Sequence, residues 1–389
     1  MPTAPAIDPA RLTDLVASLV RTNSVNPGLV PGAPGESAIA QRCASLLENA
    51  GLVVETLEST PMRPSVLATL PGARAGRSLM LNAHLDTVGV DGMTEPFSAR
   101  IDGRRLHGRG AYDMKGAAAA CIEAAAAVAC SDIRLAGDLV VALVADEEVA
   151  SLGMEEILAR RTTDCAIVTE PTDLRLCLAH KGFAWFEVTT TGVAAHGSQH
   201  DLGVDANLRM GRFLARLDAL ERDLRARTPH PLVGPPTLHA ATIAGGVGIS
   251  TYSPRCTLRI ERRLIPGETP QQAEAELRAI IDDLRREDPE LRIDLRADLA
   301  REPFEADPNG PTARAVAAAC RTVTGAAPAI IGENPWMDSA LLQAAGVDTV
   351  VVGPGGAGAH AEQEWVDLDS VERLASILIE SALSICGTT

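Results

Sequence analysis

The sequence predicts an α/β fold with two domains, the second inserted into the first. Short apolar runs bounded by turn residues alternate with helical stretches, which is typical of an α/β sheet. Residues 183–298 differ, because alternating strands and long amphipathic helices replace that pattern. The chain has 389 residues and 46% hydrophobic content, which is enough for two domains of ordinary size.

The first domain begins with two amphipathic helices and continues with buried strands. The first helix is expected over 8–22 with Asp8 as its N-cap, and the second over 36–51 with Gly51 closing it. Strands are then expected at 65–72, 78–87, 139–148 and 165–171, with helices at 114–129 and 151–161 between them. In such sheets the functional groups collect at the carboxyl ends of the strands.

The inserted domain is expected to be α+β. It contains an alternating strand, FAWFEVTTTG, a long helix over 207–227, two antiparallel strands, a helix over 269–288 and a last strand near 291–298. Residues 311–325 and 349–356 show again the pattern of the first domain, a helical stretch and a short apolar run bounded by turn residues. The predicted domains are therefore 1–182 and 299–389 for the first domain, and 183–298 for the insert.

Composition excludes several classes of protein. The 51 acidic and 35 basic side chains give a net charge of −16, which disfavours nucleic acid in the absence of a basic patch. The first residues lack a basic start and an apolar core, and Glu123 interrupts the alanine-rich stretch, so we expect no membrane span and a cytoplasmic protein. The eight scattered cysteines form no CxxC pair and are interpreted as buried thiols.

Histidines and carboxylates gather where the predicted strands end. The set comprises His84, Asp86, Asp113, Glu147, Glu148, Glu170 and His360. Carboxylates this close would raise one another's pKa, and a divalent cation would remove that conflict. Nitrogen and oxygen donors without thiolates suit zinc, with cobalt and manganese also compatible.

Each motif also has a simpler interpretation. His84 is expected to bind metal while Asp86 fixes its tautomer, although Asp86 could be an unrelated surface residue. Asp113 lies in a glycine-rich loop that allows close approach to a ligand, but it could also cap the following helix. Of Glu147 and Glu148, one could bind metal and the other accept a proton, or both could be an acidic start to the helix over 151–161.

Taken together, the motifs resemble the M20 metallopeptidase family, which includes acetylornithine deacetylase, succinyl-diaminopimelate desuccinylase, aminoacylase and carboxypeptidase G. The matching segments occur in the family's order along almost the whole chain: HLDTV, GRGAYDMKG, DEEVASLG, TEPT, HKG, GVAAHGS and GPGGAGAHAEQEWV. The resemblance implies a zinc-peptidase-like catalytic domain with a mixed sheet and an inserted α+β lid, or dimerisation, domain.

The resemblance also implies roles for the site residues. His84 and Glu170 would hold one divalent metal ion, Glu148 and His360 a second, and Asp113 would bridge the two. Glu147 would be the general base, and Asp86 would support His84. Asp146 is not required by the family pattern and is expected to be structural.

The implied activity is a dinuclear metal-dependent hydrolysis of an amide bond by activated water. The segments HKGFAWFEV and GENPWMDSALLQAAG resemble the acetylornithine deacetylase-like branch, and Glu170 favours an N-acyl amino acid as substrate, because several peptidases of the family have Asp there. A metallo-dipeptidase or carboxypeptidase acting on short peptides is the alternative. A non-catalytic binding protein is a remote third, disfavoured by the complete set of site residues.

The resemblance assigns three more residues to the lid. His196 would steady the oxyanion across the interface of a homodimer. Arg263 would bind a substrate carboxylate, with a structural ion pair to Glu261 or Glu268 as the alternative. Ser250 would contact substrate where many relatives have Asn.

Overall fold

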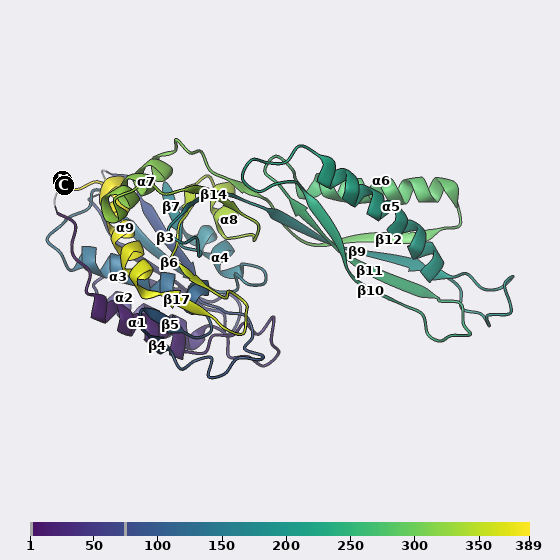
Figure 1. Ribbon diagram of the computed structural model, residues 1–389, viewed down its shortest axis with the longest axis horizontal. Coiled ribbons are helices and arrows are strands. Elements are labelled where there is room, and N and C mark those ends of the chain that lie inside the picture. The colour runs from purple at the N-terminus through teal and green to yellow at the C-terminus, as the bar shows by residue number, and fades with distance from the viewer. Residues whose placement is uncertain (1–2, 74–75) are drawn as a thin grey trace. The chain divides into compact units, whose positions relative to one another are not determined.

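The computed structural model describes residues 3–73 and 76–389, and the chain divides into two compact units (Figure 1). The first unit consists of Met1–Leu178, Ala306–Ile331 and Met337–Thr389. The second unit consists of Ala179–Glu305 and Gly332–Trp336. The insert expected at 183–298 therefore lies inside the second unit, which is several residues longer at each end and gains a short separate segment.

A mixed sheet, most of which lies in the first unit, forms the centre of that unit, as the sequence predicts. Its described strands follow the order β1-β2-β6-β3-β7-β15-β8-β13, with β14 also paired to β8. Strands β3, β6, β7 and β15 are parallel, whereas β1, β2, β8 and β13 join antiparallel. The bounds are β1 Val53–Leu57, β2 Ser65–Leu70, β3 Leu79–His84, β6 Leu139–Val144, β7 Cys165–Val168, β8 Leu176–His180, β13 Phe304–Glu305, β14 Ile330–Glu333 and β15 Asp348–Val351.

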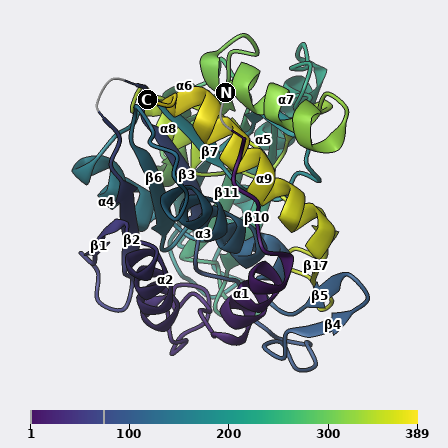
Figure 2. The same cartoon turned by 90° about the vertical axis from the view of Figure 1, so that its left-hand side faces the viewer.

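Helices cover both faces of this sheet, so its central strands are apolar throughout. Strands β3 and β6 are buried along their whole length. Figure 2 shows α1, α3 and α9 in front of the central strands. Helix α4 lies on the opposite face: the connection from β6 to β7 that contains it crosses the sheet in the opposite direction to the connection from β3 to β6 that contains α3, and both connections are right-handed. The helices are α1 Pro9–Arg21, α2 Ser37–Asn49, α3 Gly116–Ala129, α4 Leu152–Arg160, α7 Pro311–Thr324, α8 Ser339–Ala344 and α9 Leu368–Cys386.

The local sequence signals explain where several of these helices begin and end. The Asp8 side chain accepts hydrogen bonds from the amides of Ala10 and Arg11, which confirms it as the N-cap of α1. Gly51 follows α2 with a φ of 91°, a left-handed conformation that glycine adopts without strain. Helix α3 is buried on all sides, which accounts for its alanine-rich sequence.

A small second sheet in the first unit was not predicted from the sequence. Its strand order is β16-β17-β5-β4, all antiparallel. The strands are β4 Arg100–Asp102, β5 Arg105–His107, β16 Gly356–Ala357 and β17 Trp365–Asp367. A short turn, η1 (Ala111–Lys115), follows β5 and leads into α3. This sheet joins the segment before Asp113 to the segments on either side of His360.

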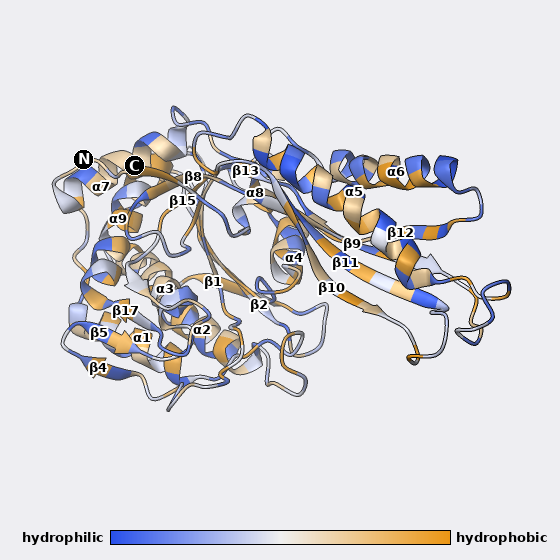
Figure 3. Ribbon diagram, turned by 45° about the vertical axis from the view of Figure 1, so that its right-hand side comes forward, coloured by the Kyte–Doolittle hydropathy of each residue, from blue (hydrophilic) through white to orange (hydrophobic). Residues whose placement is uncertain are grey.

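The second unit is a two-layer α+β structure. Its antiparallel sheet has the order β10-β11-β9-β12, with β9 Gly182–Thr191, β10 Thr237–Gly245, β11 Arg255–Leu264 and β12 Arg292–Arg301. Helices α5 Ala206–Ala226 and α6 Pro270–Glu287 pack on this sheet around a core that includes Phe186, Phe213 and Ile260. Figure 3 shows hydrophilic and hydrophobic residues alternating along α6, as expected for a helix with one buried face.

Most of the cysteines are buried, as the sequence predicts. Seven of the eight cysteines are buried and none forms a disulfide, and only Cys130 is exposed. None of the described helices combines the length and the apolar character that crossing a bilayer requires.

Candidate dinuclear metal site

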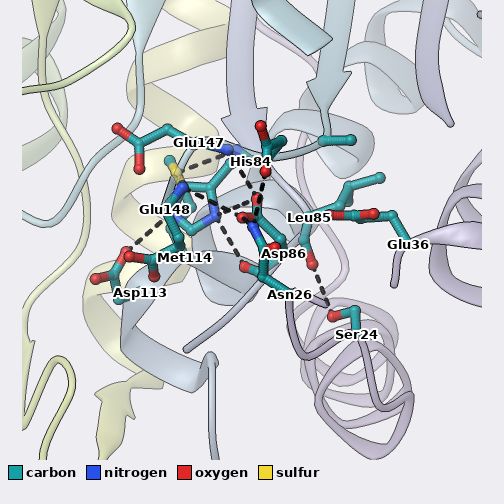
Figure 4. A network of polar contacts seen from close by, with 12 residues as sticks. Ser24, Asn26, Glu36, His84, Leu85, Asp86, Asp113, Met114, Glu147 and Glu148 are labelled. Atoms are coloured by element: carbon teal, nitrogen blue, oxygen red, sulfur yellow. Dashed lines mark hydrogen bonds and ion pairs between the residues drawn. The ribbon is translucent and has the colours of Figure 1, made fainter. Parts of the chain in front are cut away.

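Five side chains expected to bind metal lie together at one edge of the central sheet, and Figure 4 shows three of them, His84, Asp113 and Glu148. His84 is the last residue of β3, Glu148 follows β6 and Glu170 follows β7, and these three parallel strands have their carboxyl ends at the same edge. His360 comes from the loop between β16 and β17 of the small sheet. Asp113 reaches that edge from the turn η1.

His84 has the tautomer that a metal ligand requires. Its Nδ1 lies 2.9 Å from the Asp86 carbonyl oxygen, which can only accept, so Nδ1 carries a proton and Nε2 is the nitrogen that faces the other donors. Nε2 lies 3.0 Å from Asp113 Oδ1 and 3.7 Å from Glu170 Oε1. The sequence predicts that the Asp86 carboxylate orients this ring. That carboxylate is 3.6 Å from Nδ1, and the carbonyl of the same residue takes its place.

The Asp113 carboxylate lies between the two imidazoles. Oδ1 faces His84, and Oδ2 is 3.3 Å from Nε2 of His360. The same His360 nitrogen is 3.0 Å from Glu148 Oε2. One oxygen of Asp113 is thus directed to each half of the donor set.

These donor spacings fit bound divalent ions. Nitrogen and oxygen ligands about 2.0–2.2 Å from a tetrahedral ion lie about 3.4 Å from one another. The spacings between the paired donors are 3.0–3.7 Å. Two overlapping groups of donors, His84 with Asp113 and Glu148, and His84 with Glu147 and Glu170, each come within 4.8 Å of one another.

The electrostatics of the protein groups also favour a bound cation. Burial raises the pKa of Glu147 and of Glu170 well above the usual range, and neighbouring carboxylates raise both further. Hydrogen bonds to Asp113 and Glu148 raise the pKa of His360 to about 10. Carboxylates held together in this way repel one another, and divalent ions would remove that repulsion without protonating the ligands.

Glu147 and its neighbour Glu148 belong to different groups of candidate donors. The backbone amide of Glu147 donates to Asp86 Oδ1 at 3.1 Å, and the amide of Glu148 donates to Asp86 Oδ2 at 3.2 Å. Among residues 3–73 and 76–389, none donates a hydrogen bond to the Glu147 carboxylate, which leaves it available to accept a proton.

The helix-terminus alternatives do not account for these carboxylates. Helix α3 begins at Gly116, and Asp113 is directed at the two imidazoles instead of capping it. Helix α4 begins at Leu152, so Glu147 and Glu148 lie before its first turn, which contains Glu155 instead.

The second unit brings two of the residues predicted for substrate contact together. The segment of His196 pairs antiparallel with that of Thr251, and the Gly197 amide donates to the Ser250 carbonyl at 2.8 Å. His196 and Ser250 are both exposed, and His196 Nδ1 lies 2.8 Å from the Ser198 hydroxyl.

The two neighbouring arginines of β11 differ sharply. Arg262 is buried and pairs with Glu268 at 2.8 Å and with Glu276 at 3.3 Å, which is a structural role. Arg263 points to the other face of the sheet, is about one-third exposed, and lies 3.0 Å from Glu261. Of the two, Arg263 is the arginine accessible to a ligand.

Comparison with known proteins identifies the family. The family model "Peptidase family M20/M25/M40" matches residues 80–384, which is most of the chain. The chain belongs to this family. The resemblance drawn from the sequence motifs is therefore confirmed, and the protein is an M20 hydrolase.

Three relatives illustrate the range of this M20 family. An acetylornithine deacetylase of Myxococcus xanthus is 30% identical over 99% of both chains. An N-formyl-4-amino-5-aminomethyl-2-methylpyrimidine deformylase of Bacillus subtilis is 27% identical over 92% of this chain and 91% of that protein. A Bacillus subtilis M20 peptidase that binds a dinuclear metal centre superposes with a TM-score of 0.75 at 15% identity, over 98% of this chain and 99% of that one. At that identity the last comparison supports the fold alone.

Sequence reasoning missed a carboxylate that holds the Asp113 loop of this M20 protein. Buried Glu364 accepts hydrogen bonds from the amides of Gly110, Tyr112 and Asp113 at 2.9–3.0 Å, and from Arg109 Nη1 at 2.7 Å. Arg109 also donates to the carbonyls of neighbouring loops. The only local signal was the position of Glu364 four residues after His360.

Proposed function

We propose that the protein hydrolyses the amide bond of an N-acyl α-amino acid, as an acetylornithine deacetylase-like enzyme of the cytoplasm. The observation that carries this proposal is a complete set of paired metal donors with a carboxylate free to move protons beside it. The deacetylase of Myxococcus xanthus, which is similar over its full length, supports this choice of substrate class.

The donor set fits two divalent ions, with zinc the first choice and cobalt or manganese compatible with the same ligands. His84 and Glu170 would hold one ion and Glu148 and His360 the other, with Asp113 shared between them. Bound there, the ions would polarise the acyl carbonyl and make a nearby water more acidic.

Glu147 would move the proton. It takes one proton from the attacking water as the oxygen–carbon bond forms, and gives it to the amine nitrogen as the carbon–nitrogen bond breaks. Burial of the Glu147 side chain raises its pKa, which makes it a better proton acceptor than an exposed glutamate.

The second unit would supply the contacts to substrate. His196 would donate a hydrogen bond to the oxyanion, where the negative charge of the transition state develops. Arg263 would bind the substrate α-carboxylate with its planar fork, and the exposed Ser250 segment would contact the rest of the amino acid. We propose that the protein is a homodimer and that His196 acts across its interface.

Dilution tests this use of His196. If the partner subunit supplies the imidazole, activity should fall together with the dimer fraction as the protein is diluted through its dimer dissociation constant, measured by analytical ultracentrifugation. A monomer with full specific activity would rule out action across the interface.

A substrate panel tests the proposed function. Zinc-, cobalt- and manganese-loaded enzyme is assayed on N-acetyl, N-succinyl and N-formyl amino acids, including acetylornithine, and on plain dipeptides. Preference for one class of acylated amino acid would support the proposal. Hydrolysis of dipeptides alone would make the protein a peptidase, with the same donor set and base but a different substrate.

A further inference from the structure

Behind the metal donors lies a buried polar cluster that the proposed chemistry does not use. We call it the support cluster, and every member has an exposed fraction of 8% or less. Its members come from five separate segments of the first unit: Asn26, Glu36, Arg63, Asp86 and Asp146. Buried charges are retained only where they are paired and hydrogen-bonded, so the contacts in this cluster define what it does.

Arg63 lies at one end of the support cluster and joins two carboxylates. Its Nε and Nη2 donate to the two oxygens of Glu36 at 2.6 and 2.8 Å, a bidentate pair. The same Nη2 donates to Asp146 Oδ1 at 2.7 Å. Glu36 thus fixes the plane of the guanidinium, and the guanidinium fixes Asp146.

Asn26 connects Asp146 to Asp86. Its Nδ2 donates to Asp146 Oδ1 at 3.1 Å and to Asp86 Oδ2 at 2.7 Å (Figure 4). Its Oδ1 accepts from the Gly28 amide at 2.8 Å, which fixes the orientation of the amide group. The cluster is therefore continuous from Glu36 to Asp86, which lies two residues after the proposed metal donor His84.

The support cluster ends at the turn that presents Glu147 and Glu148. Asp146 precedes that turn with a φ of 69°, a left-handed conformation that a residue with a side chain rarely adopts. Its side chain is held by Arg63 and Asn26, and its carbonyl accepts from the Ala150 amide at 3.1 Å. Asp86 holds the amides of the next two residues.

We propose that Arg63, aligned by Glu36, is a positioning residue that fixes the Glu147–Glu148 turn through Asp146. Arg63 is the cation of a cluster that contains three carboxylates, and it contacts two of them at once. A lysine would keep the charge but not the planar fork that reaches both. The proton-transfer role of Glu147 rests on the proposed function. The role of Glu148 requires only that it binds metal.

The test compares Arg63→Lys with Arg161→Lys. Arg161 donates to Asp138 at 2.6 Å, immediately before β6, whereas Arg63 donates to Asp146 just after the same strand. The pair therefore separates an effect on the turn from the general loss of an arginine–carboxylate contact beside β6. Each variant is measured for both zinc dissociation constants by chelator competition, for kcat and KM, and for urea stability.

Arg63→Lys should weaken one zinc site about tenfold and leave the other within about threefold, because Glu148 is the only one of the five proposed metal donors that lies in the turn after Asp146. We expect kcat to fall about tenfold at saturating zinc with little change in KM, while Arg161→Lys keeps both zinc constants and kcat. Loss of stability in Arg63→Lys with unchanged zinc constants and kcat would overturn the proposal.

A second variant covers the case in which Arg63→Lys does not fold. Glu36→Gln keeps the shape of the side chain but loses one acceptor of the bidentate pair. The same selective loss of affinity at one zinc site is therefore expected. Unchanged zinc constants and kcat in that variant would overturn the proposal as well. The zinc measurement also distinguishes a failure of the proposed function from a failure of the proposed role of Arg63. A wild-type protein that hydrolyses none of the substrates would end the proposed function, and the zinc constants of the variants would still decide the role of Arg63.

Discussion

Glu364 shows at the scale of single residues how one buried carboxylate shapes the site. It accepts three backbone amides of the Asp113 loop and one guanidinium nitrogen, so all its contacts are to donors. A carboxylate can satisfy four donors, whereas an amide side chain has only one acceptor oxygen. The loop geometry, and with it the direction of Asp113, therefore depends on the charge of this side chain.

Glu364→Gln should lower the free energy of unfolding by about 2–4 kcal/mol, because it leaves buried donors and Arg109 without an acceptor. It should also lower kcat at least tenfold, because Asp113 shifts. Urea unfolding and steady-state kinetics measure both effects. The control is Glu362→Gln on the same loop, which is exposed and should change stability by less than about 0.5 kcal/mol. Equal effects of the two substitutions would contradict this role.

The sequence predicted the candidate metal donors that the structure brings together, but not the residues that hold them in place. His84, Glu148 and Glu170 were recognisable because each follows an apolar run, and parallel strands end at one edge. Glu364 and Arg63 gave no such signal, since their partners are distant in sequence: Glu364 holds residues 110–113, and Arg63 holds Asp146. Pairings between distant segments are set by the tertiary fold, and neither propensity nor periodicity encodes them.

At the scale of secondary-structure elements, the turn between β6 and α4 is tightly packed. Gly153, in the first turn of α4, donates its amide to the Ala145 carbonyl at 3.1 Å. A Cβ atom at Gly153 would lie 2.5 Å from the Ala145 amide nitrogen and 2.4 Å from the Ser65 hydroxyl. The helix can approach the strand this closely only without a side chain at that position.

Gly153→Ala should therefore destabilise the protein by about 1–3 kcal/mol, because the backbone beside Asp146 must move. Activity should fall as the Glu147–Glu148 turn is displaced. The matched control is Gly211→Ala in α5, where no atom lies within 4 Å of an added Cβ and alanine should stabilise the helix by about 0.5–1 kcal/mol. A stable, fully active Gly153→Ala variant would contradict this prediction, because the Glu147–Glu148 turn would then tolerate the displacement.

Elements of the second unit were predicted more completely than those around the site. Helices α5 and α6 lie within a few residues of their expected positions, because each has one buried and one exposed face, and strands β9 and β12 also lie close to theirs. The small sheet β16-β17-β5-β4 was missed, since its strands have only two or three residues, too few to show a period. That sheet joins the chain segments next to Asp113 and His360.

At the scale of the whole molecule, the two compact units have separate cores, and all the proposed metal donors belong to the first. A ligand that binds only the folded state stabilises the unit that contains its site. Metal binding should therefore act on one unit and leave the intrinsic stability of the other unchanged.

Removing metal with a chelator should abolish hydrolysis and lower the unfolding transition of the first unit. Metal at a thousand times its dissociation constant contributes about 4 kcal/mol. Calorimetry measures the transitions, and Trp365→Phe leaves Trp185 and Trp336, both in the second unit, as fluorescent reporters of that unit. A fluorescence transition of that variant that shifts as far as the calorimetric transition would contradict separate cores.

The central claim is that Glu147 transfers the proton in a metal-dependent amide hydrolysis. The most direct test measures kcat of wild type and Glu147→Gln on the best substrate of the panel, with the bound metal of both proteins counted. We predict equal metal content and a kcat about 10³-fold lower in the variant, because the glutamine amide cannot accept the proton. A variant with equal metal content and near wild-type kcat would contradict the account.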